Sequence, residues 1–371
     1  MQKEKLGMFE LYSLLTVMLV AKVFYTSIRS LCQQTGTAAW QAGLVSEAGT
    51  LVAFGTLYAL LRRWPGQDLP TIIRNKLGSG VATVLGFVWT GFGVFYCAIT
   101  FREIGELLKT YHLHNITLSV LVGIFVLVAC FLSWQGVIHL GRLAALCFWP
   151  VLVGIVAILL LSIPQYHPVN LAPWMGYGLS NTLSYGFQRI SAYGGELWVL
   201  LTIAGNVRDT RVLGRASLFA LLTGGVVITA SVLCYTMAFS YPVAGISLSP
   251  ILQMVKQVYF GRFFQRFEAI FLFVFVVLAI LCISTYLYAT AYWCSCTLRL
   301  RHPRYPLIPL AVLIFWGALL PTDISQLMQV YLAFLRQRSG WLTILLPLAM
   351  LLLAWLFGKR RTGEEAKQHE A

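Results

Sequence analysis

Ten apolar runs, each about as long as a membrane-spanning helix, dominate this sequence. A span takes roughly 20 apolar residues at a rise of about 1.5 Å each. In hydrocarbon every backbone N–H and C=O must be paired inside the protein, so runs of this length form helices. We therefore expect an all-α integral membrane protein, with spans near residues 8–33, 40–62, 79–101, 116–134, 139–163, 180–206, 213–240, 264–293, 305–321 and 340–358.

Composition and charge placement agree with that class. Hydrophobic residues make up 58% of the 371, charged residues 11%, and the net charge is +14. If the N-terminus is inside, 17 of the Lys and Arg residues fall on the inner side and 7 on the outer side. This positive-inside bias predicts that both termini are cytoplasmic and makes membrane lipid, not nucleic acid, the expected partner. Residues 1–358 then form one domain, followed by a polar tail over 359–371.

Few residues offer catalytic or metal chemistry. Cys294 and Cys296 are a tempting metal pair, but no second pair or histidine cluster accompanies them at ligand spacing. Most of the other cysteines sit in apolar runs, where a thiol behaves as a small hydrophobic group. No nucleophile–base set or phosphate loop is apparent. We expect no metal, no cofactor and no enzymatic activity.

The sixth run, Ser184–Val207, carries Arg189, the pair Gly194-Gly195, and Glu196 near mid-membrane. A helix that is broken and charged at that depth is typical of a transporter ligand site. A break at the glycines would expose free N–H groups and a positive dipole end to a ligand carboxylate. Glu196 would receive a ligand ammonium or pair with Lys22; the alternatives are that it only caps the half-helix, and that the glycines only allow close packing.

The first run is interrupted in the same way, by Lys22, Tyr25, Thr26 and Ser27. The chain splits into halves of about 8–163 and 180–358, and each half begins with an interrupted helix. This pattern predicts an inverted repeat whose two broken helices face a central site. Lys22 would substitute for a coupling cation or titrate, or be a paired structural lysine; Glu47 in the second run is a candidate partner.

Further residues are assigned lesser roles. Tyr193 would close over the site or only pack, and Arg189, Arg266 and Glu268 are interpreted as structural or coupling charges. Three amphipathic stretches, 67–77, 250–261 and 322–336, are expected to lie in the interface or cap the bundle, without chemistry.

Several motifs, in order along nearly the whole chain, resemble the spore-germination permease family, the membrane B subunits of endospore germinant receptors. They are Gly36-Thr-Ala-Ala-Trp40, Trp64-Pro-Gly-Gln-Asp-Leu69, the stretch from Pro164 to Pro173, Tyr193-Gly-Gly-Glu196, Phe260-Gly-Arg-Phe-Phe-Gln-Arg-Phe-Glu-Ala-Ile270 and Ser284-Thr-Tyr-Leu-Tyr-Ala-Thr290. One departure is the first break, Val20-Ala-Lys-Val-Phe-Tyr-Thr-Ser27, where the family usually has small residues and a proline.

The resemblance implies a ten-helix, LeuT-like bundle of five plus five helices in the spore inner membrane. It implies a subunit that works with A-type and C-type receptor subunits and senses a small nutrient, often an amino acid. In such a fold Ser284, Thr285 and Tyr286 would face the central site, where their hydroxyls bind ligand or bond back to the helix. Two other hypotheses remain: a proton-coupled amino-acid permease of the vegetative membrane, and a scaffold subunit that binds no ligand.

Overall fold

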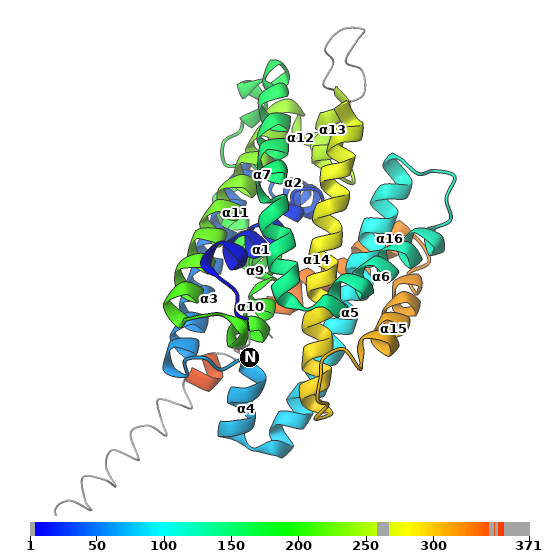
Figure 1. Ribbon diagram of the computed structural model, residues 1–371. Helices are drawn as coiled ribbons and strands as arrows, with labels where there is room; N and C mark the ends of the chain where they lie inside the picture. The colour runs from blue at the N-terminus through cyan, green and yellow to red at the C-terminus, as the bar shows by residue number, and fades with distance from the viewer. Residues whose placement is uncertain (1–3, 258–266, 341–344, 346–347, 352–371) are drawn as a thin grey trace, which may run out of the picture.

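The computed structural model describes residues 4–257, 267–340, 345 and 348–351 (Figure 1). Regular structure in these residues is helical, apart from a single bridge between Leu6 and Val207. Within the described residues, six helices are long and apolar enough to cross a membrane, or up to seven if one bent pair forms a single span. The predicted all-α membrane class is confirmed, and the count of ten spans stays a prediction.

The first predicted span is broken as expected. Helix α1 (Met8–Ala21) ends before Lys22, and α2 (Ser27–Thr35) begins only after Thr26. Between them the backbone makes short turns, with each N–H from Lys22 to Tyr25 bonding the carbonyl three residues back. These i to i−3 hydrogen bonds are tighter than those of an α-helix. They interrupt the helix inside the bundle while its backbone polar groups remain paired.

The sixth predicted span is interrupted twice. It consists of α8 (Leu179–Gln188), α9 (Ile190–Gly194) and α10 (Leu197–Ile203). At the second interruption Gly195 and Glu196 keep near-helical dihedrals, so the break is a turn and not an extended gap. A Cβ added at Gly194 would lie 2.8 Å from Cγ2 of Thr50, so this glycine also allows close helix packing.

The remaining helices surround these two. The first half supplies α3 (Ala39–Arg63), α4 (Leu69–Leu77), α5 (Ser79–Tyr111), α6 (Leu118–Gln135) and α7 (Val137–Leu161). The second half supplies α11 (Thr210–Ala238), α12 (Tyr241–Ala244), α13 (Pro250–Gln257), α14 (Phe267–Thr297) and α15 (Leu307–Leu319). The N-terminus and α4 lie at one end of the bundle, whereas α12 and α13 lie at the other (Figure 1). Helix α14 is the central one, with 72% of its apolar window buried.

One predicted helix end and one predicted location are wrong. The span expected to end at residue 101 continues as α5 to Tyr111, with Arg102 and Glu103 buried. The stretch 322–336, expected at the interface or as a cap, belongs to a helix formed by α16 (Ile324–Gln326), a π-helical segment (Leu327–Leu332) and α17 (Ala333–Gly340). This helix turns 109° from α15 and reaches the protein centre, where its polar face meets buried charges. Most of the predicted span 340–358 lies outside the described residues.

Helices α5 and α14 approach closely through small residues. A Cβ at Gly93 would lie 2.5 Å from Oγ1 and 3.0 Å from Cγ2 of the buried Thr290. Gly91, on the same helix, has nothing within 4 Å of such a Cβ. Gly93→Val should therefore force the helices apart at a cost of about 1–3 kcal/mol, whereas Gly91→Val serves as the matched control. Thermal unfolding of both purified variants in detergent checks this, and equal midpoints would contradict it.

Candidate functional site

A buried ion pair joins the two helix breaks. Lys22 Nζ lies 2.5 Å from Glu196 Oε2, with side chains only 7% and 3% exposed. The same ammonium donates to the Tyr193 carbonyl at 3.4 Å. Tyr286 of α14 donates its hydroxyl to the other carboxylate oxygen, Glu196 Oε1, at 2.7 Å. Because both charges have left water, these contacts are needed to offset their desolvation.

A second polar cluster ties α5 and α17 to the first break. Glu103 Oε1 accepts hydrogen bonds from the Thr26 N–H at 2.9 Å and the Thr26 hydroxyl at 2.6 Å. Arg336 Nη2 completes the cluster, 2.8 Å from Glu103 Oε1 and 2.8 Å from Thr26 Oγ1. The carboxylate thus takes over the N–H that the interrupted helix leaves unpaired, and it anchors the arginine of a distant helix.

The two clusters border one small cavity of about 30 Å³. One water molecule needs roughly 10–15 Å³, whereas pockets for small ligands usually measure about 300–1,000 Å³. The centre is therefore filled almost completely by its own side chains. Its walls are formed by Lys22, Tyr25, Ser27, Tyr96, Thr100, Glu103, Tyr286, Leu332, Leu335 and Arg336.

A column of aromatic rings, here called the aromatic column, extends from this cavity. Tyr96 meets Tyr286 edge-on at 4.8 Å, and Tyr286 stacks on Trp198 at 6.0 Å. Trp198 continues to Trp89 at 6.5 Å, which stacks on Trp293 at 5.1 Å. All five rings are buried, so they fill the interior between the cavity and the last turns of α14.

Several predicted residues do gather at the centre. Tyr25 and Ser27 line the cavity, Thr26 binds Glu103, and Tyr193 contributes its carbonyl. Gly194 lies against α3, and Gly195 lies in the turn before Glu196. The structure brings these groups together around Lys22 and Glu196.

Other predicted residues lie elsewhere. The buried hydroxyls of Ser284 and Thr285 donate to carbonyls of their own helix, at 2.6 Å and 2.7 Å, and neither residue lines the cavity. Arg189 stacks over the Tyr185 ring at 4.8 Å and does not pair with Glu196. Arg266 and the side chain of Glu268 lie outside the described part of the chain.

Glu47 has a separate environment. Its carboxylate packs against α11, because a Cβ at Gly225 would lie 2.3 Å from Glu47 Cδ. Its Oε1 atom is buried and has no hydrogen-bond partner among the described residues. A carboxyl group with one buried oxygen that lacks a donor is less costly when it is protonated and uncharged.

Sequence reasoning missed Glu103 and Arg336 as central residues. The predicted span 79–101 stops before Glu103, although Ile104, Leu107 and Leu108 continue the helical spacing of apolar residues. For Arg336 no local signal exists, since an amphipathic stretch has the same pattern against water as against a polar interior.

The fold of this chain is similar to that of a transporter of known structure. The fold matches that of Mhp1, a nucleobase–cation-symport-1 family transporter solved in a closed conformation with bromovinylhydantoin bound. The TM-score is 0.54 at 16% sequence identity, covering 92% of this chain and 78% of that one. The chain therefore has a transporter fold, and its long apolar helices make it an integral membrane protein.

Sequence comparison identifies the family within this class of membrane proteins. Residues 5–327 match the model of a family described as spore germination protein. Over 349 residues the chain is 22% identical to spore germination protein KB of Bacillus subtilis (strain 168), covering 90% of this chain and 91% of that protein. The chain belongs to the spore germination permease family, as its motifs predict, and this is a permease-like family and not an enzyme family.

Proposed function

We propose that this protein is the permease-type membrane subunit of a germinant receptor, which senses a small nutrient and triggers spore germination. The family match and the relative's name support the receptor role, and the shared transporter fold supports a ligand site at the centre. We further propose a ten-helix, five-plus-five inverted repeat with both termini cytoplasmic, placed in the spore inner membrane with A-type and C-type subunits.

The Lys22–Glu196 ion pair is the observation that carries this proposal. It joins the two helix breaks, so its rupture would free both breaks to move apart. A nutrient ammonium is chemically equivalent to the Lys22 ammonium and would compete with it for Glu196. An amino acid is therefore the favoured nutrient, and the small cavity implies that the centre widens when the nutrient enters.

Two alternatives have their own support. The Glu47 carboxyl group favours a proton-coupled amino-acid permease of the vegetative membrane. Its Oε1 atom has no hydrogen-bond partner among the described residues, and a carboxyl group within a span can carry a proton. The 30 Å³ centre favours a scaffold subunit that binds no nutrient.

Gene deletion with complementation tests the proposal. Spores without the gene should lose their germination response to one nutrient of a panel, and vegetative cells should take up the labelled nutrient normally. Lost uptake with normal germination would instead establish the permease. Lost germination, together with no nutrient binding to the purified receptor complex by calorimetry, would establish the scaffold.

Glu47→Gln separates sensing from proton coupling. An amide keeps the shape of a neutral carboxyl group, so we expect the free energy of unfolding to change by less than about 1 kcal/mol. Under the sensor proposal, spores carrying this variant germinate with unchanged nutrient dependence. Loss of nutrient uptake driven by a pH gradient, at normal protein abundance, would favour the permease.

A further inference from the structure

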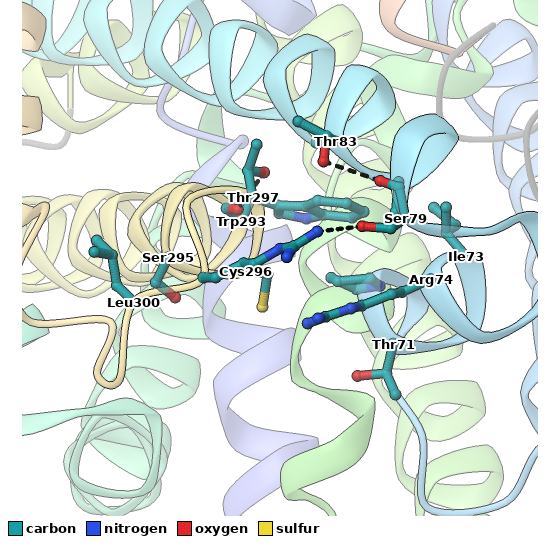
Figure 2. Close-up of a pocket in the computed structure, with 14 residues that line it drawn as sticks. Thr71, Ile73, Arg74, Ser79, Thr83, Trp293, Ser295, Cys296, Thr297 and Leu300 are labelled. Atoms are coloured by element: carbon teal, nitrogen blue, oxygen red, sulfur yellow. Dashed lines mark hydrogen bonds between the residues drawn. The ribbon is translucent and has the colours of Figure 1, made fainter.

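A second, larger cavity lies at the α4 end of the bundle, away from the centre. Its volume is about 250 Å³, far above the roughly 10–15 Å³ that one water molecule requires. Figure 2 shows its walls, formed by α4, the first turns of α5, the last turn of α14 and the residues just after α14. Trp293, the last ring of the aromatic column, lines it, but none of the residues that line the central cavity does.

Two guanidinium groups face this cavity from distant parts of the chain, Arg74 of α4 and Arg299 after α14. Neither forms an ion pair with a carboxylate among the described residues. The nearby carboxylate of Asp68 is engaged otherwise, accepting hydrogen bonds from the Thr71 N–H and the Tyr292 hydroxyl. No described carboxylate, Asp68 included, is therefore within ion-pair distance of either guanidinium group.

The backbone at Arg299 is unusual. Its φ of 56° is left-handed, and it is the one non-glycine residue with positive φ in the described part of the chain. It follows a helix end that closes with a Leu300 N–H to Ser295 carbonyl bond of 2.9 Å, a position where glycine is usual. An arginine there costs of order 1 kcal/mol of backbone strain. Its guanidinium donates to the Ser79 hydroxyl oxygen, which holds it on the cavity wall.

Further donors on the wall lie near Arg299 and Arg74, whereas the hydroxyls of Thr83, Ser295 and Thr297 already donate to backbone carbonyls. Ser79 is the first residue of the 33-residue helix α5, whose first N–H groups have no partner within the helix and form its positive end. The Ser79 hydroxyl accepts from Arg299, which leaves its own proton available to a ligand. Thr71 adds a further hydroxyl to the same wall. Two guanidinium groups, a helix start and hydroxyls match the oxygens of a phosphate group.

The surroundings of the cavity indicate how a phosphate group would arrive. The exposed apolar side chains of Val81, Val84, Leu298 and Leu300 belong to the same helix ends. A phosphate on an acyl-bearing molecule would place its charge in the cavity and its chains along this apolar surface. We propose that this cavity binds the phosphate group of an anionic phospholipid headgroup or of a soluble phosphate ester.

The test uses the purified full-length protein and two charge-removing changes. Arg74→Gln removes one guanidinium group, and Arg299→Gly removes the other while keeping the left-handed backbone. Arg211→Gln, at an exposed arginine of α11 outside the cavity, is the matched control for lost charge. Native mass spectrometry measures retained phosphatidylglycerol against phosphatidylcholine, and thermal unfolding measures binding of glycerol phosphate and inorganic phosphate.

We expect the wild type and Arg211→Gln to retain phosphatidylglycerol selectively. The Arg74→Gln/Arg299→Gly double variant should bind it about tenfold or more weakly, at unchanged elution volume and helical content. Stabilisation by glycerol phosphate that depends on the same arginines would identify the soluble source and also support the phosphate site. Equal binding of all probes by the double variant and Arg211→Gln, or no binding of any phosphate probe by the wild type, would overturn the proposal.

Discussion

Lys22→Met is expected to destabilise the protein strongly, and Lys22→Met/Glu196→Gln is expected to restore much of the lost stability. The single change leaves the Glu196 carboxylate buried without its ammonium, at a cost of about 3–5 kcal/mol. The double change removes both charges and leaves neutral groups, with the Tyr286 hydroxyl still beside residue 196. Thermal unfolding of the purified variants, together with abundance by blot, measures this rescue.

Germination separates the structural role of the pair from ligand binding. If Glu196 receives the nutrient ammonium, the double variant is abundant and folded yet does not respond to the nutrient. Glu196→Gln alone should also lose the response to that nutrient in a panel. An unchanged response at normal abundance would reduce both charges to a structural role and favour the scaffold hypothesis.

Arg336→Gln is expected to loosen α17 over the central cavity. It removes the charged partner of Glu103, leaving that buried carboxylate with the two Thr26 bonds. We expect a loss of about 2–4 kcal/mol in the free energy of unfolding, because the pair is largely buried. Arg142→Gln is the matched control, since Arg142 pairs with Glu4 at 3.0 Å but is half exposed, and such surface pairs contribute about 0–1 kcal/mol.

Cysteine labelling tests whether this cluster also closes the cavity. Ser27 lines the cavity beside Arg336, so a Ser27→Cys variant reports access to the centre. Labelling by a membrane-impermeant maleimide, measured above the background of the parent protein, should be faster with Arg336→Gln than with Arg142→Gln. Equal rates would show that α17 is held by other contacts and that this cluster does not act as a gate.

The membrane class and the two helix breaks could be predicted from local sequence. Long apolar runs, together with Lys22 in one run and Gly194 to Glu196 in another, mark positions where a helix in hydrocarbon is interrupted. The limits of α5 and of the 324–340 helix could not be predicted from local sequence, because charged residues next to an apolar run usually mark the end of a membrane span. Here the two helices continue into the protein interior past Glu103 and Arg336, because these two side chains form an ion pair there.

The sequence by itself determined that this chain is a helical membrane protein, where its first and sixth spans break, and which family it resembles, because these properties follow from hydrophobic length and local residue order. Only the tertiary structure decided that Lys22 lies against Glu196, that Tyr286 and not Ser284 or Thr285 faces the centre, and that Glu103 meets Arg336. Each buried charge takes the partner that helix packing brings within hydrogen-bond distance. These contacts join residues up to 310 positions apart, so no local sequence pattern contains them.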